Sequence, residues 1–136
     1  MSLTVRVIAP DKTVWDAEAE EVILPSTTGQ LGILSGHAPL MTALDVGVMR
    51  VRPAKDWVAI ALMGGFAEVD NDEVTILVRG AERGDSIDQD DARSAFETAQ
   101  ATMTATSSDD RQAALQARQA LQKARARLQA AGGSVG

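Results

Sequence analysis

The sequence contains no cysteine and no tyrosine, and aromatic residues make up only 3% of its 136 residues. Because it has no thiol, it has no disulfide, no zinc–thiolate site and no cysteine nucleophile. The few aromatic rings offer little surface for stacking on nucleic-acid bases. The net charge of −6 also opposes binding to a phosphate backbone. We therefore expect a protein that does not bind nucleic acid.

Histidine is also scarce, since His37 is the only one. It has no histidine or cysteine companion with which to hold a metal or activate a nucleophile. No glycine is followed by lysine, which excludes a Walker-type phosphate loop. The acidic groups at 70–73 and 88–91 fit a turn and a helix N-terminus better than a catalytic or calcium site. We expect no metal site and no catalytic residues, although an enzyme that uses an acid pair remains a distant alternative.

Long apolar runs are missing as well. The longest, residues 57–66, is much shorter than the roughly 20 residues that a membrane span needs. Charges at Arg6, Asp11 and Lys12 interrupt any signal peptide. We expect a soluble protein of a reducing compartment, without direct membrane insertion, and a peripheral place on a membrane complex stays open.

Short alternations of apolar and polar residues dominate the first 84 residues. Leu3, Val5 and Val7 alternate with polar neighbours, which predicts a half-buried strand over residues 3–8. Further strands are expected near 13–16, 19–24, 46–52, 57–63, 66–69 and 74–78, with turns at 10–12, 25–26 and 70–72. Many short strands separated by turns predict a two-sheet β-sandwich over about residues 1–84.

Residues 27–40 hold three glycines, a proline and His37 around a short apolar core. Glycine accepts positive φ, and proline fixes φ without offering an amide donor. The stretch predicts a tight chain reversal that exposes backbone and His37. A structural corner and a contact site are both open interpretations of it.

The composition changes after Gly84, where proline disappears and alanine, glutamine and arginine dominate. Ser86 and Gln89 have the spacing of a capping box, which predicts a helix over about 88–104. A short break precedes a second helix, expected over about 110–131. The predicted fold class is α+β, with a sandwich domain at 1–84 and an antiparallel helical hairpin at 85–136.

Alanine fills most positions where the two helices are expected to pack. These positions are Ala92, Phe96, Ala99 and Met103 on the first helix and Ala114, Ala117, Leu121, Ala124, Leu128 and Ala131 on the second. Burying a CH₂-sized group contributes about 0.8 kcal/mol, against about 2 for a whole leucine side chain. The helices are therefore predicted to be good in themselves but weakly docked, and the second helix to be mobile.

Positive charge gathers at the C-terminal end. From Arg111 onward there are five basic residues and no acid, so the rest of the chain carries −6 − 5 = −11. Arg111, Arg118 and Arg125 recur every seven residues and share one helix face. This face is either solvated, as suits a helix C-terminus, or it meets an anionic partner such as an acidic protein surface or a nucleotide phosphate.

Four stretches resemble the epsilon subunit of F-type ATP synthases, and the resemblance covers nearly the whole chain. They are Val7-Ile8-Ala9-Pro10, residues 21–29 (EVILPSTTG), residues 31–40 (LGILSGHAPL) and residues 64–69 (GGFAEV). The N-terminal residues look most like the cyanobacterial and chloroplast forms. The resemblance implies a β-sandwich of about ten strands followed by a two-helix hairpin, the architecture that the residue patterns predict.

The resemblance also implies a non-catalytic subunit of the central rotor stalk, bound to the gamma subunit and the ring of c subunits. There the sandwich couples ring rotation to the catalytic head of the proton-translocating synthase. The family region that faces gamma and the c ring matches the loop with His37, so Leu31, Ser35, His37 and Pro39 are the expected contact residues. Such a subunit is peripheral, at the cytoplasmic or stromal face of the thylakoid (or plasma) membrane.

In this family the helices fold against the sandwich or extend along gamma toward an acidic segment of the beta subunit, which inhibits ATP hydrolysis. The resemblance implies that Arg118, Lys123, Arg125 and Arg127 meet that segment.

Some members of the family bind ATP on the hairpin, through Ile or Leu, then Asp, two residues, Arg and Ala. Here residues 89–94 (QDDARS) keep Asp90 and Arg93 but differ at both outer positions. The extra carboxylate of Asp91 would repel phosphate. We expect weak or no ATP binding and no other cofactor, and a nucleotide-sensing module that closes on ATP is the alternative function.

Overall fold

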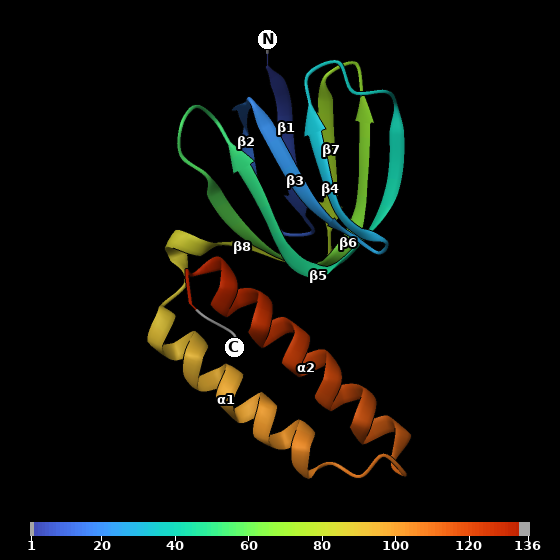
Figure 1. Ribbon diagram of the computed structural model, residues 1–136, viewed down its shortest axis with the longest axis vertical. Coiled ribbons are helices and arrows are strands. Elements are labelled where there is room, and N and C mark those ends of the chain that lie inside the picture. Colours follow the sequence, from blue (N-terminus) through green and yellow to red (C-terminus); the bar gives the residue numbers. More distant parts are fainter. Residues whose placement is uncertain (1, 134–136) are drawn as a thin grey trace.

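The computed structural model describes residues 2–133, which form a β-sandwich above a helical hairpin (Figure 1). The strands are β1 (Leu3–Ala9), β2 (Lys12–Ala19), β3 (Glu21–Ser26), β4 (Gly29–Leu34), β5 (Leu40–Arg52), β6 (Val58–Asp70), β7 (Glu73–Val78) and β8 (Ala81–Arg83). A 3₁₀ turn (Gly84–Ser86) leads to the helices α1 (Gln89–Ala105) and α2 (Arg111–Ala130). The predicted fold class is confirmed.

The strands pair in the order β2-β1-β7-β6-β5-β3-β4, and β8 pairs with β6. Strands β5 and β6 are 13 residues long and bend at the base of the sandwich, so that each runs through both layers (Figure 1). At the bend of β6, Gly64 and Gly65 have φ of +83° and +157°. A Cβ on Gly65 would lie 2.2 Å from the carbonyl oxygen of Leu77, so the backbones of β6 and β7 approach closely here.

Eight strands occur in the described residues, where the resemblance implied about ten. One reason is that Gly64 and Gly65 bend β6 without ending it, so that the two segments expected at 57–63 and 66–69 form one strand. Trp57, expected inside this strand, lies before it and is exposed.

The period-two alternation of the N-terminal segment is confirmed, because Leu3, Val5 and Val7 are fully buried between half-buried neighbours. They belong to a core of mostly large aliphatic side chains between the two layers. Each such side chain contributes about 1.5–3 kcal/mol when it leaves water. This core makes the sandwich a rigid support for its loops.

The expected chain reversal over residues 27–40 is wrong in its extent. Residues 29–34 form β4, which pairs with β3 residue by residue from Ser26–Gly29 to Glu21–Leu34. Residues 27–28 form the tight turn between β3 and β4, and residues 35–39 form a loop. Pro25 was expected to end a strand but lies inside β3, where the register between β3 and β5 shifts, so its missing amide hydrogen breaks no regular ladder.

The capping box at Ser86 and Gln89 is also wrong. Ser86 lies in the 3₁₀ turn, and its hydroxyl donates to the carbonyl oxygen of Arg83 at 2.8 Å. The cap of α1 is Asp88, whose carboxylate accepts the amide hydrogen of Asp91 at 3.0 Å. Asp110 caps α2 in the same way through the amide of Ala113, at 3.1 Å. Both helices therefore start on an aspartate.

Helix α2 lies between the bend of β5 and β6 on one side and α1 on the other (Figure 1). Its buried residues are Ala117, Ala124, Ala126, Leu128 and Ala130. Ala126 and Ala130 lie outside the predicted seam, because they pack toward the sandwich, where Val48 and Ala61 are also covered. Among the described residues, neither helix has the length and the apolar character that crossing a bilayer would require.

Candidate functional site

The loop of residues 35–39, here called the His37 loop, lies at the end of the sandwich remote from the helices (Figure 1). The β6–β7 turn lies beside it, with positive φ at Asn71 and Asp72. The carboxylate of Asp72 accepts the amide hydrogen of Gly36 at 2.7 Å and the hydroxyl hydrogen of Ser35 at 2.9 Å. The turn thus fixes the start of the His37 loop across a sequence separation of more than 35 residues.

These contacts favour the ionised carboxylate. The amide of Gly36, and then the hydroxyl of Ser35, lower the pKa of Asp72 below its usual value. Hydrogen bonds to a charged acceptor are stronger than those between neutral groups. The His37 loop is therefore held best when Asp72 is charged.

The four predicted contact residues of this region have different environments. Leu31 is half-buried and packs against the sandwich core, and the hydroxyl of Ser35 bonds to Asp72. His37 is half-buried, with its Nδ1 2.7 Å from the carbonyl oxygen of Ala38, and Pro39 is exposed. His37 and Pro39 thus offer surface to a partner, whereas Leu31 and Ser35 also have a structural role.

Two apolar residues that flank the loop were missed. Leu34 ends β4 with 55% of its surface exposed, and Met41 near the start of β5 has 64% exposed. Each lies on the outward phase of its strand, next to an inward residue such as Ile33. An apolar residue on the polar phase of a strand is the signal that would have found them.

The four basic residues predicted to meet an acidic segment fall on two sides of α2. Arg118 and Arg125 lie within about 20° of each other around the helix, whereas Lys123 and Arg127 lie about 140° and 180° away from Arg118. Arg118, Lys123 and Arg125 are exposed. Arg127 instead binds Glu82 of β8, with its Nε 2.9 Å from Oε1 and its Nη2 3.2 Å from Oε2. One flat partner surface cannot contact all four at once.

A groove of about 500 Å³ runs between the two helices. Most of its lining residues have small side chains, and two of them are basic residues of α2. The lining residues are Ser94, Ala95, Thr98, Ala99, Thr102, Ala120, Lys123, Ala124 and Arg127. Its volume is in the range of small-molecule sites.

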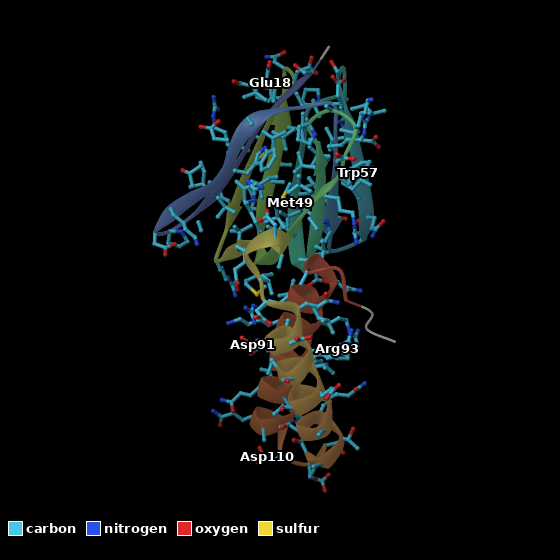
Figure 2. All side chains as sticks on the ribbon, turned by 90° about the vertical axis from the view of Figure 1, so that its left-hand side faces the viewer. Glu18, Met49, Trp57, Asp91, Arg93 and Asp110 are labelled. Carbon is cyan, nitrogen blue, oxygen red and sulfur yellow. The ribbon has the colours of Figure 1, made fainter. Side chains whose placement is uncertain are left out.

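The predicted ATP residues Asp90 and Arg93 are outside the set that lines this groove. Asp90 is exposed in the first turn of α1, and Arg93 is half-buried in the second. Figure 2 shows Arg93 and Asp91 on opposite sides of α1, at the end near the sandwich.

The sequence analysis also missed an earlier register of the ATP motif, residues 87–92 (IDQDDA). In this register Ile87 and Asp88 match the first two motif positions, and Ala92 matches the last. Asp91 stands where the motif has arginine, which places a negative charge at a phosphate-binding position. Ile87 is buried and Asp88 caps α1, so both have structural roles as well.

Comparison with known proteins identifies the family. The family model of the ATP synthase delta/epsilon chain β-sandwich domain matches residues 2–84, and that of the delta/epsilon chain long α-helix domain matches residues 85–132. The chain belongs to the ATP synthase delta/epsilon family. It is 70% identical to the ATP synthase epsilon chain of Trichodesmium erythraeum over 136 residues, which is 99% of each chain. It is 71% identical to that of Thermosynechococcus vestitus over 136 residues, again 99% of each.

Solved structures agree at the level of the fold. The delta/epsilon fold of this chain superposes on a chain of the Euglena gracilis mitochondrial ATP synthase (OSCP/F1/c-ring) with a TM-score of 0.80 and 22% identity. The match covers 96% of this chain and 81% of that one. A weaker likeness, with a TM-score of 0.52 and 14% identity, is to the central stalk/c-ring of the Tetrahymena thermophila mitochondrial enzyme, over 63% of this chain and 69% of that one.

Proposed function

We propose that the chain is the epsilon subunit of a proton-translocating F-type ATP synthase, a non-catalytic part of its central stalk. The observation that carries this proposal is the match over almost the entire length, at about 70% identity, to proteins that are ATP synthase epsilon chains. In this role the subunit links rotation of the c ring, through gamma, to the catalytic head.

The two domains divide this work. The sandwich, residues 1–84, anchors the subunit to gamma and the c ring, with the His37 loop and Leu31 at the contact. The half-buried His37 and the exposed Pro39, Leu34 and Met41 support a contact at this end. The hairpin, residues 85–136, is the regulatory part.

The hairpin inhibits ATP hydrolysis by extending toward an acidic segment of a beta subunit. Arg118 and Arg125 support this role, because they are exposed on one face of α2. Lys123 adds a third exposed cation farther round the helix, and Arg127 becomes available once it leaves Glu82. The subunit is peripheral, and its cyanobacterial relatives support a place at the cytoplasmic or stromal face of a thylakoid or plasma membrane.

The groove between the helices favours nucleotide sensing as a second candidate function. Its volume of about 500 Å³ and the cations Lys123 and Arg127 suit a polyphosphate. Glu82 neutralises Arg127, however, and Asp91 adds a negative charge nearby on α1. We therefore expect titration calorimetry with Mg-ATP to show weak binding or none. Micromolar affinity that Lys123→Ala abolishes would establish nucleotide sensing in this groove, and micromolar affinity that Arg93→Ala abolishes would establish it at the predicted motif.

The main proposal is tested with catalytic heads that contain gamma but lack epsilon. ATP hydrolysis is measured after addition of the full-length chain or of a chain that ends after Gly84, with binding to gamma measured in parallel. We expect both to bind and only the full-length chain to slow hydrolysis. Equal inhibition by both would remove the regulatory role of the hairpin, and failure of the full-length chain to bind would contradict the central-stalk assignment.

A further inference from the structure

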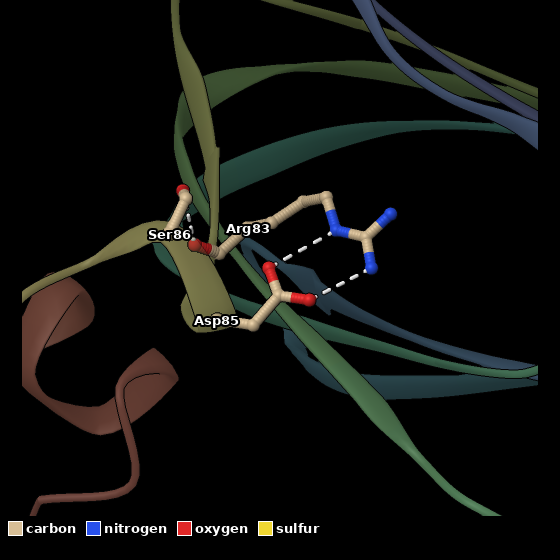
Figure 3. A network of polar contacts seen from close by, with 3 residues as sticks. All are labelled: Arg83, Asp85 and Ser86. Carbon is tan, nitrogen blue, oxygen red and sulfur yellow. Dashed lines mark hydrogen bonds and ion pairs between the residues drawn. The ribbon is translucent and has the colours of Figure 1, made fainter.

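The segment that joins the two domains, residues 82–86, contacts both of them. Glu82 binds Arg127 of α2, and Arg83 lies over the ring of Trp15 in β2, 5.2 Å from its centre. Arg83 also binds the carboxylate of Asp85 at 2.9 and 3.2 Å (Figure 3). The segment is thus tied to the sandwich through Arg83 and to the hairpin through Glu82.

The Glu82–Arg127 pair spans 45 residues of sequence and joins β8 to the last turn of α2. Its two hydrogen bonds are parallel, which is the strong geometry for arginine and a carboxylate. The side chain of Arg127 is 28% exposed and that of Glu82 38% exposed. Water therefore reaches the pair, and salt weakens it.

The apolar contact beside this pair is close but small. A Cβ on Gly84 would lie 1.9 Å from the carbonyl oxygen of Ala130, so the two backbones touch. The side chains buried there are mostly alanine, and they remove little area from water. The Glu82–Arg127 ion pair therefore adds a polar contact to a small apolar one at the junction of hairpin and sandwich.

We propose that Glu82 is an internal latch, which holds Arg127 in the folded hairpin in place of the carboxylates of an outside partner. Glu82 occupies the Nε–Nη2 edge of Arg127 in the docked hairpin, so an acidic surface can bind this edge only after Glu82 has left it. An acidic partner, or raised ionic strength, releases the hairpin by taking over or screening Arg127. The latch concerns the position of the hairpin in the free chain, and its regulatory meaning rests on the proposed function.

The test measures the position of the hairpin in the full-length chain. The absence of native cysteine allows spin labels at only two introduced cysteines, Ser107→Cys at the hairpin tip and Lys55→Cys in the β5–β6 loop. Electron–electron distance measurements give the fraction of molecules whose hairpin has left the sandwich. At low salt we expect Glu82→Gln and Arg127→Gln each to raise this fraction about threefold to tenfold.

The matched control is Arg118→Gln, the same change at an exposed position of the same helix, which should leave the distances unchanged. The double variant Glu82→Arg with Arg127→Glu should restore the folded fraction and shows that the single variants do not act through misfolding. High salt should shift the spin-label distances of the original chain toward those of Glu82→Gln. The latch is refuted if Glu82→Gln leaves the distances unchanged, if Arg118→Gln has the same effect, or if the charge exchange rescues nothing.

The inhibitory role is tested separately, by adding Glu82→Gln to the epsilon-depleted heads. With a working latch, this variant should inhibit hydrolysis more strongly than the original chain. An opened hairpin without any inhibition would refute the regulatory part of the proposed function and leave the latch standing.

Discussion

The two hydrophobic clusters of this chain differ in the size of their side chains. The sandwich cluster contains residues such as Leu24, Ile60 and Ile76, all fully buried. The cluster that joins α1, α2 and the base of the sandwich is mostly alanine, with Ile87, Phe96 and Leu128 as its large members. Since buried area sets the hydrophobic contribution, we expect the hairpin to separate from the sandwich at a lower free-energy cost than the sandwich needs to unfold.

A second difference runs along the hairpin itself. In the last two turns of α2, which lie near the sandwich, residues 124, 126, 128 and 130 are buried. Toward the tip, Ala117 is the buried residue of the first half of α2, and the last turn of α1 is mostly exposed. We therefore expect α1 and α2 to separate first at the tip of the hairpin and last at the Glu82–Arg127 pair.

The largest expected effect is a cavity in the sandwich. Ile76→Ala should lower the free energy of unfolding by about 2–5 kcal/mol, because Ile76 is fully buried among large neighbours. Ala124→Gly in the hairpin should cost only about 1 kcal/mol, mainly from helix propensity. Denaturant titration of both variants measures these changes. Equal losses in the free energy of unfolding would show that the two clusters contribute equally to stability.

A tight contact between the domains gives the next effect. Gly84→Ala places a methyl group against the carbonyl of Ala130, and overpacking of this kind costs about 1–3 kcal/mol. We expect faster amide exchange in residues 124–130 with little change in β1. Gly32→Ala is the control, since no atom lies within 4 Å of its new Cβ and its φ is not positive. Unchanged exchange in Gly84→Ala would mean that the hairpin is not docked there in solution.

Hydrogen exchange of the unmodified chain sharpens the comparison further. Amides from Gln112 to Leu128 should exchange faster than those of residues 59–62, which lie in a strand that pairs on both sides. Within α2, residues 112–120 should exchange faster than 124–128. Protection equal to that of β6 would contradict the mobility of α2 that the alanine seam predicts.

The smallest effect concerns the remote end of the sandwich. Folding lowers the pKa of Asp72, so its stabilising contribution is present above the usual carboxyl pKa and is lost as pH falls through the lowered value. Acid should therefore loosen residues 35–37 as pH falls through this lowered value. The amide shift of Gly36 follows this in an NMR titration. Asp72→Asn should remove the transition, whereas Asp70→Asn, in the same turn, should keep it.

Local patterns in the sequence predicted most of the fold. Alternation located β1, and the Asp70–Asp72 turn located the β6–β7 hairpin, because both signals lie within a few residues. Strand β4 was missed since its glycines hide the alternation, and its pairing with β3 is what orders it. Burial of Ala126 and Ala130 follows from the docking of α2 on the sandwich, which no helical period reveals.

The candidate site was less predictable than the fold. The basic residues of α2 were found from composition, and the helical repeat divides them between two faces. The Glu82–Arg127 bond is different, because it joins positions 45 residues apart. Asp72 reaches the His37 loop in the same long-range way. Contacts of this kind depend on the tertiary fold, and a single sequence carries no local mark of them.

The bend of β5 has a mechanical consequence. The strand begins at Leu40, directly after the His37 loop, and continues without interruption to Val48, where the hairpin docks. Nine residues of strand backbone, about 26 Å measured along the chain, thus connect the two ends of the sandwich. A force at the loop is carried by covalent bonds and by the pairing of β5 with β6 along this stretch. The sandwich is therefore a continuous mechanical link between the His37 loop and the place where the hairpin docks.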